Sequence, residues 1–190
     1  TKQAAAAVGQ CELMYTYDKL FSEHRHTVAQ LLITGEDVAN AQRHQNFSNT
    51  INRLLELGVL PIINENDTVS TAELGIGDND TLAAIVAQSV KADKLVLLSD
   101  IAGLYTADPH TDPNARLISK VTVLDDSLTA LAGGSNNKQG TGGMVTKLHA
   151  AKICMDCGCD MIIANGADPE NLYAIMDGRE VGTTFTGVAR

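Results

Sequence analysis

The sequence predicts an α/β protein built on a mainly parallel sheet. Four apolar stretches of strand length recur along the chain, and segments with helical periodicity separate most of them. Strands that alternate with helices are typical of a parallel sheet that is covered on both faces. With 190 residues and 44% hydrophobic content, the chain is long enough for one domain with a substantial core. The expected strands are residues 27–33, 59–63, 94–98 and 160–164.

Helical segments fill the intervals between these strands. The helical pattern from residue 4 to 20 begins without a recognisable cap or an initiating Met, so we expect that an amino-terminal part is missing. Residues 37–57 form the clearest helix, because their apolar side chains make one stripe and Gly58 is placed to end it. Further helices are expected at residues 81–90 and 144–158.

Two polar segments interrupt the alternation of strands and helices. Residues 68–76 are rich in Thr, Ser and Gly, and we expect a loop or small hairpin there. Residues 133–143 are too polar and too rich in glycine for a core element, and we expect a mobile loop that a ligand orders. No internal repeat or low-complexity linker divides the sequence, so one domain is expected over residues 1–190.

The composition argues against several classes of partner. The net charge of -9 opposes binding to a phosphate backbone, so nucleic acid is not an expected partner. No apolar run approaches the ~20 residues that span a bilayer, and we expect a soluble, cytoplasmic protein with no membrane partner. The proximity of Cys154, Cys157 and Cys159 suggests a metal or redox site. No second ligand cluster accompanies these thiols, so packing at a helix end is the favoured interpretation.

Carboxylates and amides crowd one strand end and the start of the next helix. Asn64 and Asp67 follow an apolar run, and residues 77–80, Gly-Asp-Asn-Asp, open the helix at residue 81. In open α/β sheets, ligands bind beyond the carboxyl ends of the strands. Carboxylates grouped in this way repel one another unless a cation lies among them, and an amino-acid ammonium, a lysine or Mg²⁺ would serve. We therefore predict an active site for a small polar ligand here.

A second polar constellation combines a glycine-rich turn with a lysine. The turn Gly140-Thr-Gly-Gly143 enters a helix, where backbone N–H groups favour an anion. Lys147 lies one turn into that helix, within reach of a bound phosphate, although a flexible loop with a solvated lysine is an equal alternative. The spacing matches neither the P-loop nor the dinucleotide-binding fingerprint. Ser99 and Asp100 end another strand, where Asp100 either caps the next turn, the commoner role, or holds a metal–nucleotide or a catalytic lysine.

Four motifs follow one another along the chain: Ile63-Asn-Glu-Asn-Asp67, Gly77-Asp-Asn-Asp80, Leu97-Leu-Ser-Asp100 with Gly103-Leu-Tyr-Thr-Ala-Asp-Pro109, and Gly140-Thr-Gly-Gly-Met-Val-Thr-Lys147. Together and in this order they resemble the amino acid kinase family, and specifically its glutamate 5-kinase members. The resemblance covers nearly the whole chain and implies the family's three-layer αβα sandwich, similar to that of carbamate kinase, with a mainly parallel central sheet. It also implies transfer of the γ-phosphoryl group of ATP, used with Mg²⁺, to the side-chain carboxylate of L-glutamate, the first step of proline biosynthesis.

The resemblance also assigns roles to residues. Asp80 would organise the catalytic lysines and Lys147 would supply positive charge, so these two are the implied catalytic residues, and no residue is assigned as a metal ligand. The acidic and the glycine-rich segments are expected to face one cleft. L-glutamate would contact Asn64, Asp67, Asp78 and Asn79. ATP would contact Ser99, Asp100, Thr141, Gly142, Gly143, Met144, Val145, Thr146 and Lys147.

Family members differ from this chain at its two ends. They begin with a strand that carries a lysine, and many bacterial members append a PUA domain, so we expect a truncated kinase domain with weak or no activity by itself. Members usually self-associate as dimers or tetramers, and proline inhibits them near the glutamate site. Asp37 either borders that inhibitory site or caps a helix. Two alternatives stay open: a family member acting on acetylglutamate, aspartate or a nucleoside monophosphate, and a non-catalytic amino-acid sensor.

Overall fold

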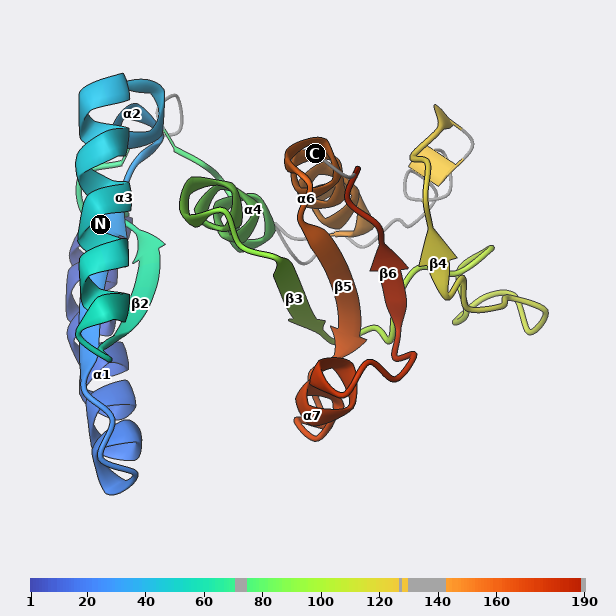
Figure 1. Cartoon of the computed structure of the whole chain (residues 1–190), viewed down its shortest axis with the longest axis horizontal. Coiled ribbons are helices and arrows are strands. Elements are labelled where there is room, and N and C mark those ends of the chain that lie inside the picture. The colour runs from blue at the N-terminus through green and yellow to red at the C-terminus, as the bar shows by residue number, and fades with distance from the viewer. Residues whose placement is uncertain (71–74, 127, 130–142, 189–190) are drawn as a thin grey trace. The chain divides into compact units, whose positions relative to one another are not determined.

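The computed structural model describes residues 1–70, 75–126, 128–129 and 143–188. Internal contacts divide the chain into two compact units, Thr1–Leu82 and Ala83–Arg190, and each is described by itself. Figure 1 shows helices and strands alternating within both units. The expectation of one domain over residues 1–190 stays a prediction.

The first unit contains a parallel pair of strands with helices beside it (Figure 1). β1 and β2 are in register from Val28 opposite Leu60 to Ile33 opposite Glu65, so both carboxyl ends lie at the same edge. Ile33, Phe47 and Ile51 are buried in this unit. Its elements are α1 (Lys2–Glu23), β1 (Val28–Ile33), α2 (Gly35–Ala39), α3 (Ala41–Glu56), β2 (Leu60–Glu65) and the start of α4 (Asn79–Val90).

The structure corrects two expectations about the helices of this unit. The single helix expected at residues 37–57 is wrong, because Asn40 adopts an extended conformation and separates α2 from α3. The Asn40 side chain accepts a hydrogen bond from the Arg43 N–H at 3.0 Å, which makes it the N-cap of α3. The expectation that α1 lacks a cap is also wrong, since the Thr1 hydroxyl accepts a bond from the Ala4 N–H at 3.4 Å. The stop at Gly58 is confirmed by its positive φ of 71°.

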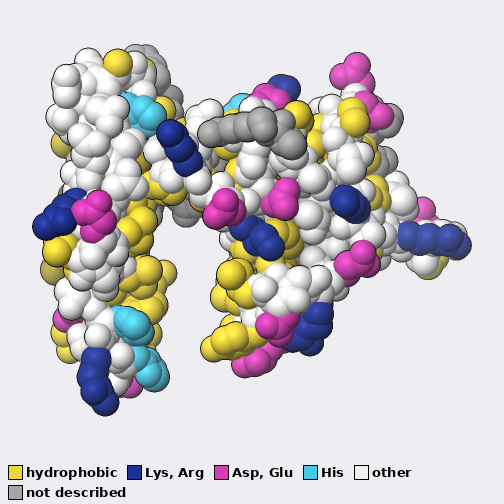
Figure 2. All heavy atoms as spheres, viewed as in Figure 1, with side chains coloured by type: hydrophobic (Ala, Val, Ile, Leu, Met, Phe, Trp, Pro, Cys, Tyr) yellow, Lys and Arg dark blue, Asp and Glu magenta, His cyan; other side chains and the backbone are white. Residues whose placement is uncertain are grey.

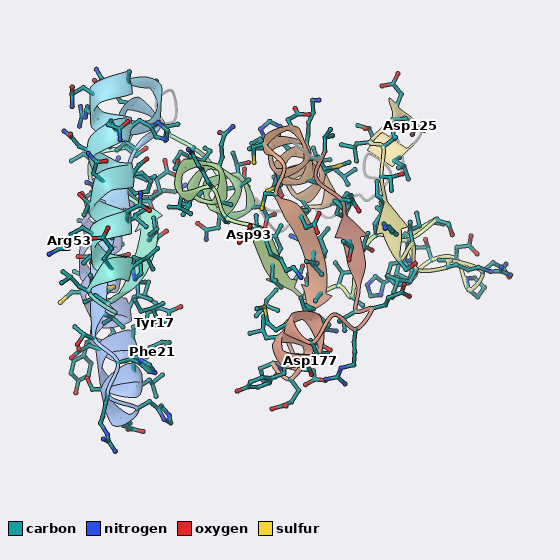
Figure 3. The ribbon with its side chains drawn as sticks, in the orientation of Figure 1. Tyr17, Phe21, Arg53, Asp93, Asp125 and Asp177 are labelled. Atoms are coloured by element: carbon teal, nitrogen blue, oxygen red, sulfur yellow. The ribbon has the colours of Figure 1, made fainter. Side chains whose placement is uncertain are left out.

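α1 contributes no buried side chain to the core of the first unit. All its residues are described, and none of them is buried. Tyr17 and Phe21, four positions apart on this helix, stack with their ring centroids 6.2 Å apart (Figure 3). Such a pair stabilises one helical turn locally.

The second unit contains a four-stranded sheet in the order β3-β5-β6-β4. β3 pairs with β5 and β4 with β6 in parallel, whereas β5 and β6 are antiparallel. The expected strands at residues 94–98 and 160–164 and the helix from residue 144 are confirmed, but the sequence did not indicate β4, β6 or α7. The elements are β3 (Lys94–Ser99), β4 (Lys120–Val121), α6 (Met144–Cys157), β5 (Asp160–Asn165), α7 (Asn171–Met176) and β6 (Thr183–Phe185).

β5 carries both cores of the second unit because its side chains alternate between the two faces of the sheet. Met161 and Ile163 join the larger core, to which α4 and α6 also contribute. Ile162 and Ala164 pack with Ile175 of α7 on the other side. The sheet of this unit is therefore buried on both faces, as expected for a layered α/β fold.

The thiols at the end of α6 take part in the larger core. Cys154 and Cys159 are buried, and their burial raises the pKa of both thiols. The Cys157 Sγ donates to the Cys154 carbonyl oxygen at 3.2 Å. These contacts are those of packed thiols.

Candidate active site

The polar end of β2 is tied to its own unit by side-chain hydrogen bonds. Asn64 Nδ2 donates to Gln10 Oε1 of α1 at 3.1 Å, and Asn64 Oδ1 accepts from the Glu65 N–H at 2.9 Å. Within the described ranges, the buried Nε2 of Gln10 has no acceptor. Both polar atoms of the Asn64 side chain therefore already have protein partners.

Glu65 is a functional candidate that the sequence reasoning missed. Its Oε1 accepts hydrogen bonds from the Ser70 hydroxyl at 3.0 Å and from the Ile76 N–H at 2.8 Å. Its Oε2 accepts a bond from the Gly77 N–H at 3.2 Å. The side chain thus holds both ends of the segment between β2 and α4. The available signal was the position of Glu65 inside the Asn-Glu-Asn-Asp motif. Two of its three partners are backbone N–H groups, which cannot be recognised from residue identity.

Asp78 caps α4. Its Oδ1 accepts from the Thr81 N–H at 2.7 Å, and its Oδ2 accepts from the Thr81 hydroxyl at 2.8 Å. The following residues, Asn79 and Asp80, form the first turn of α4, where Asn79 is exposed and Asp80 is partly buried. Asp67 is also exposed. The strand end of the first unit therefore carries Asp67, and the helix start carries Asp78, Asn79 and Asp80, as the motif spacing predicted.

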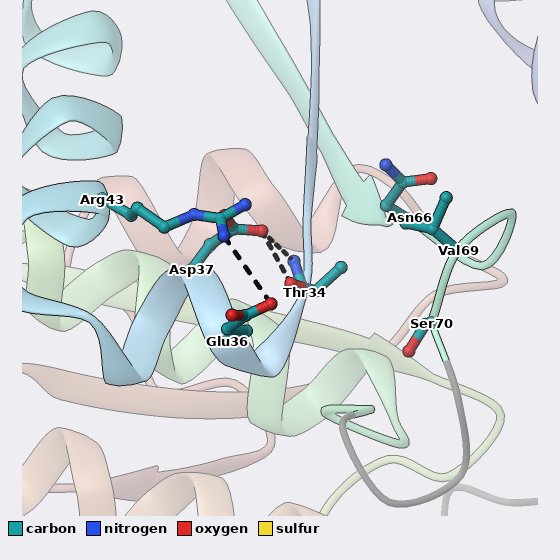
Figure 4. Close-up of a pocket in the computed structure, with 7 residues that line it drawn as sticks. All are labelled: Thr34, Glu36, Asp37, Arg43, Asn66, Val69 and Ser70. Carbon is teal, nitrogen blue, oxygen red and sulfur yellow. Dashed lines mark hydrogen bonds and ion pairs between the residues drawn. The ribbon is translucent and has the colours of Figure 1, made fainter.

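A pocket lies at the shared carboxyl edge of β1 and β2 (Figure 4). Residues that directly follow each strand line it, which is where ligands bind in α/β sheets. From the β2 side, Asn66 contributes rather than its neighbours Asn64 and Asp67. The lining residues are Thr34, Glu36, Asp37, Arg43, Asn66, Val69 and Ser70.

Asp37 is the electrostatic centre of this pocket. Its Oδ2 accepts bonds from the Thr34 N–H at 2.8 Å and the Thr34 hydroxyl at 2.7 Å, and Oδ1 pairs with Arg43 Nε at 2.6 Å (Figure 4). Burial by itself would raise the pKa of Asp37, but the bonds from Thr34 and the Arg43 charge outweigh it, so the pKa is lowered. Asp37 therefore both helps to cap α2 and lines the pocket.

The parallel strands β3 and β5 end together in the second unit. Ser99 lies opposite Asn165, and its hydroxyl donates to Asp100 Oδ1 at 3.1 Å. The Gly166 N–H donates to the Ser99 carbonyl at 2.7 Å, and Asn165 Oδ1 accepts from the Ala167 N–H at 2.8 Å. Asn165 and Gly166 were not predicted as site residues, although they lie at the end of a strand just as Ser99 and Asp100 do.

Lys147 is buried, with 7% of its surface exposed. The alternative of a solvated lysine is therefore wrong. Lysine is almost never fully buried in a protein, so this position makes Lys147 a functional candidate. The N-cap of α6 is Gly143, and the Thr146 hydroxyl donates to the Gly143 carbonyl at 2.7 Å. Met144 is partly buried and Val145 is exposed, while Thr141 and Gly142 lie outside the described residues.

The predicted site residues that the structure describes fall into two groups, one in each unit. Asn64, Asp67, Asp78, Asn79 and Asp80 belong to the first unit, and Ser99, Asp100 and residues 143–147 belong to the second. Their roles toward ligands, and the single cleft expected for them, stay predictions.

Residues 1–165 match the amino acid kinase family, over well more than half of the chain. The chain belongs to the amino acid kinase family. This family member is 56% identical to the glutamate 5-kinase of Rhodospirillum rubrum over 93% of its length, and 48% identical to that of Clostridium perfringens over 97%. It spans 47% of the first relative and 70% of the second. The resemblance in the four motifs is thereby confirmed.

Solved structures establish the fold of this family member. An isopentenyl phosphate kinase superposes on 92% of the chain with a TM-score of 0.61 and 18% identity, and the chain covers 65% of it. Carbamate kinase from Giardia lamblia bound to AMP-PNP matches 74% of the chain with a TM-score of 0.52 and 18% identity, and 44% of that protein is covered. The expected α/β fold with a mainly parallel sheet is confirmed.

Among the described helices, none is both long and apolar enough to cross a bilayer. On the face that Figure 2 shows, Lys and Arg side chains are scattered among Asp and Glu side chains.

Proposed function

We propose that the whole protein phosphorylates the side-chain carboxylate of L-glutamate with ATP, which produces glutamyl 5-phosphate at the start of proline biosynthesis. The observation that carries this proposal is the 48–56% identity to proteins named glutamate 5-kinase over at least 93% of the chain. The buried Lys147 supports it, because transfer to an anion needs fixed positive charge.

The chemistry of this reaction suits the residues. A glutamate side chain has an unperturbed pKa of about 4.3 and is ionised at neutral pH, so the attacking group needs no general base. The barrier is electrostatic, because a carboxylate must approach a polyanion in line with the leaving oxygen. Catalysis then depends on positioning both substrates and on cationic stabilisation of the transferred group.

The first unit is the proposed binding region for glutamate. Asp67 and Asn79 are exposed and offer a carboxylate and an amide to the substrate ammonium and carboxylate. Asn64 and Asp78 already have protein partners, so their proposed contribution combines substrate contact with shaping of the strand end and the helix start. Asp80, in the first turn of α4, is the proposed catalytic carboxylate.

The second unit is the proposed binding region for the nucleotide. Ser99 and Asp100 present oxygen atoms at the end of β3, a donor set that suits a ribose or a hard cation such as Mg²⁺. Residues 141–147 are the proposed phosphate-binding segment, in which Gly143 is the N-cap of α6, and Lys147 is the proposed cationic catalytic residue. When bound, Mg²⁺ would offset charge on the nucleotide phosphates.

Trapping the product as γ-glutamyl hydroxamate tests the proposal. The purified whole protein is incubated with Mg·ATP, hydroxylamine and L-glutamate, and parallel reactions contain L-aspartate or N-acetylglutamate. We expect hydroxamate from glutamate at a rate at least tenfold above the other two, a factor that corresponds to about 1.4 kcal/mol. A preference for aspartate or N-acetylglutamate would favour another family member. Calorimetric binding of glutamate without any binding of Mg·ADP would favour a sensor.

Proline inhibition and self-association as a dimer or tetramer complete the proposal. The pocket around Asp37 supports inhibition, because its carboxylate and the Arg43 guanidinium match the two charges of an amino acid. Proline should inhibit the unmodified enzyme, and Asp37→Asn should raise the required concentration about tenfold. Glu56→Gln, on the exposed part of α3, is the matched control. Light scattering across a concentration series tests self-association.

A further inference from the structure

Glu65 makes an unusual set of contacts for a residue at a strand end. Its two carboxylate oxygens accept three hydrogen bonds, from the Ser70 hydroxyl and from the backbone N–H groups of Ile76 and Gly77. The backbone donors lie 11 and 12 residues further along the chain. Hydrogen bonds to an ionised acceptor are about twice as strong as neutral ones, so this side chain is a strong clamp.

The clamp acts on a segment whose first end is already fixed. The Asn66 N–H donates to the Ile33 carbonyl of β1 at 2.7 Å, and the N–H groups of Val69 and Ser70 donate to the Asn66 carbonyl. Residues 66–70 are thereby held against the strand edge. Glu65 then joins this fixed turn to Ile76, on the far side of the connection to α4.

The far end of the segment leads directly into the predicted substrate residues. Gly77, which Glu65 holds by its N–H, has a φ of 92°, a left-handed conformation that favours glycine. Asp78 follows at once and caps α4 through Thr81. The position of Asp78 and Asn79 relative to β2 therefore depends on the Glu65 carboxylate.

We propose that Glu65 is a positioning residue, whose carboxylate joins the turn at residues 66–70 to Ile76 and Gly77 and thereby places Asp78, Asn79 and Asp80 for the amino-acid substrate. This inference rests on the proposed function for the identity of that substrate. Glu65 acts through the backbone of Ile76 and Gly77 and does not touch the substrate itself. Because these residues belong to the amino-acid side, its loss should affect glutamate more than ATP.

The variant Glu65→Gln tests the clamp with a nearly unchanged shape. The amide keeps one acceptor oxygen for Ser70 and Ile76, but it places an NH₂ group against the Gly77 N–H, and the charge is lost. In the whole protein we expect the KM for glutamate to rise roughly 10- to 100-fold, with the KM for ATP changed less than about twofold. By NMR, hydrogen exchange at the Ile76 and Gly77 amides should accelerate at least about tenfold. Glu65→Asp, which keeps the charge, should recover part of both effects.

Glu56→Gln is the control, since Glu56 is an exposed residue of α3 paired with Arg53 at 2.8 Å. It should leave both KM values and both amides unchanged. Equal changes in the two KM values of Glu65→Gln, or unchanged exchange at Ile76 and Gly77, would overturn the inference. If the unmodified protein phosphorylates no glutamate, the proposed function fails instead, and the two amides still decide whether Glu65 holds the segment. Should Glu65→Gln fail to fold, the same measurements on Glu65→Asp decide.

Discussion

The strand ends of the two units are held in place by different forces. At the end of β2, ionised side chains accept hydrogen bonds from the backbone, as Glu65 does from Ile76 and Gly77. In the second unit, close steric packing around β5 and β6 supports the strand ends, and Ile163 is fully buried. The first region should therefore respond to loss of charge, whereas the second should respond to changes of volume.

Thr183 shows how tightly the second unit is packed. Its buried hydroxyl accepts from the Leu104 N–H at 2.8 Å and donates to the Ile118 carbonyl at 2.6 Å. A side chain at Gly103 would collide with this hydroxyl, which explains the glycine in the Gly-Leu-Tyr-Thr motif by packing. The motif therefore contributes to the packing of this unit.

The largest expected effect is on stability, from Gly182→Ala in the second unit. Gly182 has a φ of 64°, and a Cβ there would collide with the Ile163 carbonyl oxygen and lie 2.8 Å from the Ala102 carbonyl oxygen. Strain and overpacking together should lower the free energy of unfolding by about 4 kcal/mol, measured by urea denaturation. Gly178→Ala has a similar φ of 77° but open space around it, and should cost about 1 kcal/mol. Equal losses in the two variants would contradict the packing argument.

Lys147→Met should have the next largest effect, on catalysis. Removing one cationic group that stabilises the transferred phosphoryl group should lower kcat roughly 10²- to 10³-fold, measured by hydroxamate formation. Met has a similar length and suits a buried position, and thermal unfolding of the variant checks that its fold persists. Lys152→Met, on the exposed side of α6 where Lys152 pairs with Asp156 at 3.3 Å, should leave kcat within about twofold. An undiminished kcat in Lys147→Met would remove this residue from the catalytic set.

In the first unit, two substitutions of Asp78 can separate its capping of α4 from its proposed contact with the substrate. Asp78→Ala removes the acceptor for both Thr81 donors and should cost about 1 kcal/mol of stability, besides raising the KM for glutamate. Asp78→Ser keeps a capping oxygen without the charge. Thermal unfolding should therefore recover in Asp78→Ser while the KM stays high. Recovery of both quantities would show that Asp78 only caps α4.

The smallest expected effect is the pH dependence of Asp37. Its lowered pKa stabilises the folded protein above the ordinary aspartate value of about 3.9, and this stabilisation is lost as the pH falls through the folded value. Asp37→Asn should cost about 1 kcal/mol at pH 7. The difference from the unmodified protein should shrink below about pH 4, measured by urea denaturation at several pH values. A constant difference over that range would place the effect of the substitution elsewhere.

Local signals were enough to locate most of the fold. Residues 27–33 and 160–164 were recognised as strands because apolar runs of that length are typical of buried parallel strands. β6 was missed because three residues carry too short a pattern. Asn40 was missed as a cap because the apolar stripe continues through it, although Asn is a favoured N-cap.

The sequence by itself determined the α/β alternation, the family and the two polar segments, because periodicity and motif order are local properties of the chain. Only the tertiary structure decided that Lys147 is buried, that Asp78 caps α4 and that Glu65 bonds to amides 11 and 12 residues away. The physical reason is that every residue except proline carries a backbone N–H. Which of these donors meets a given carboxylate depends on the path of the folded chain, and residue identity does not encode it.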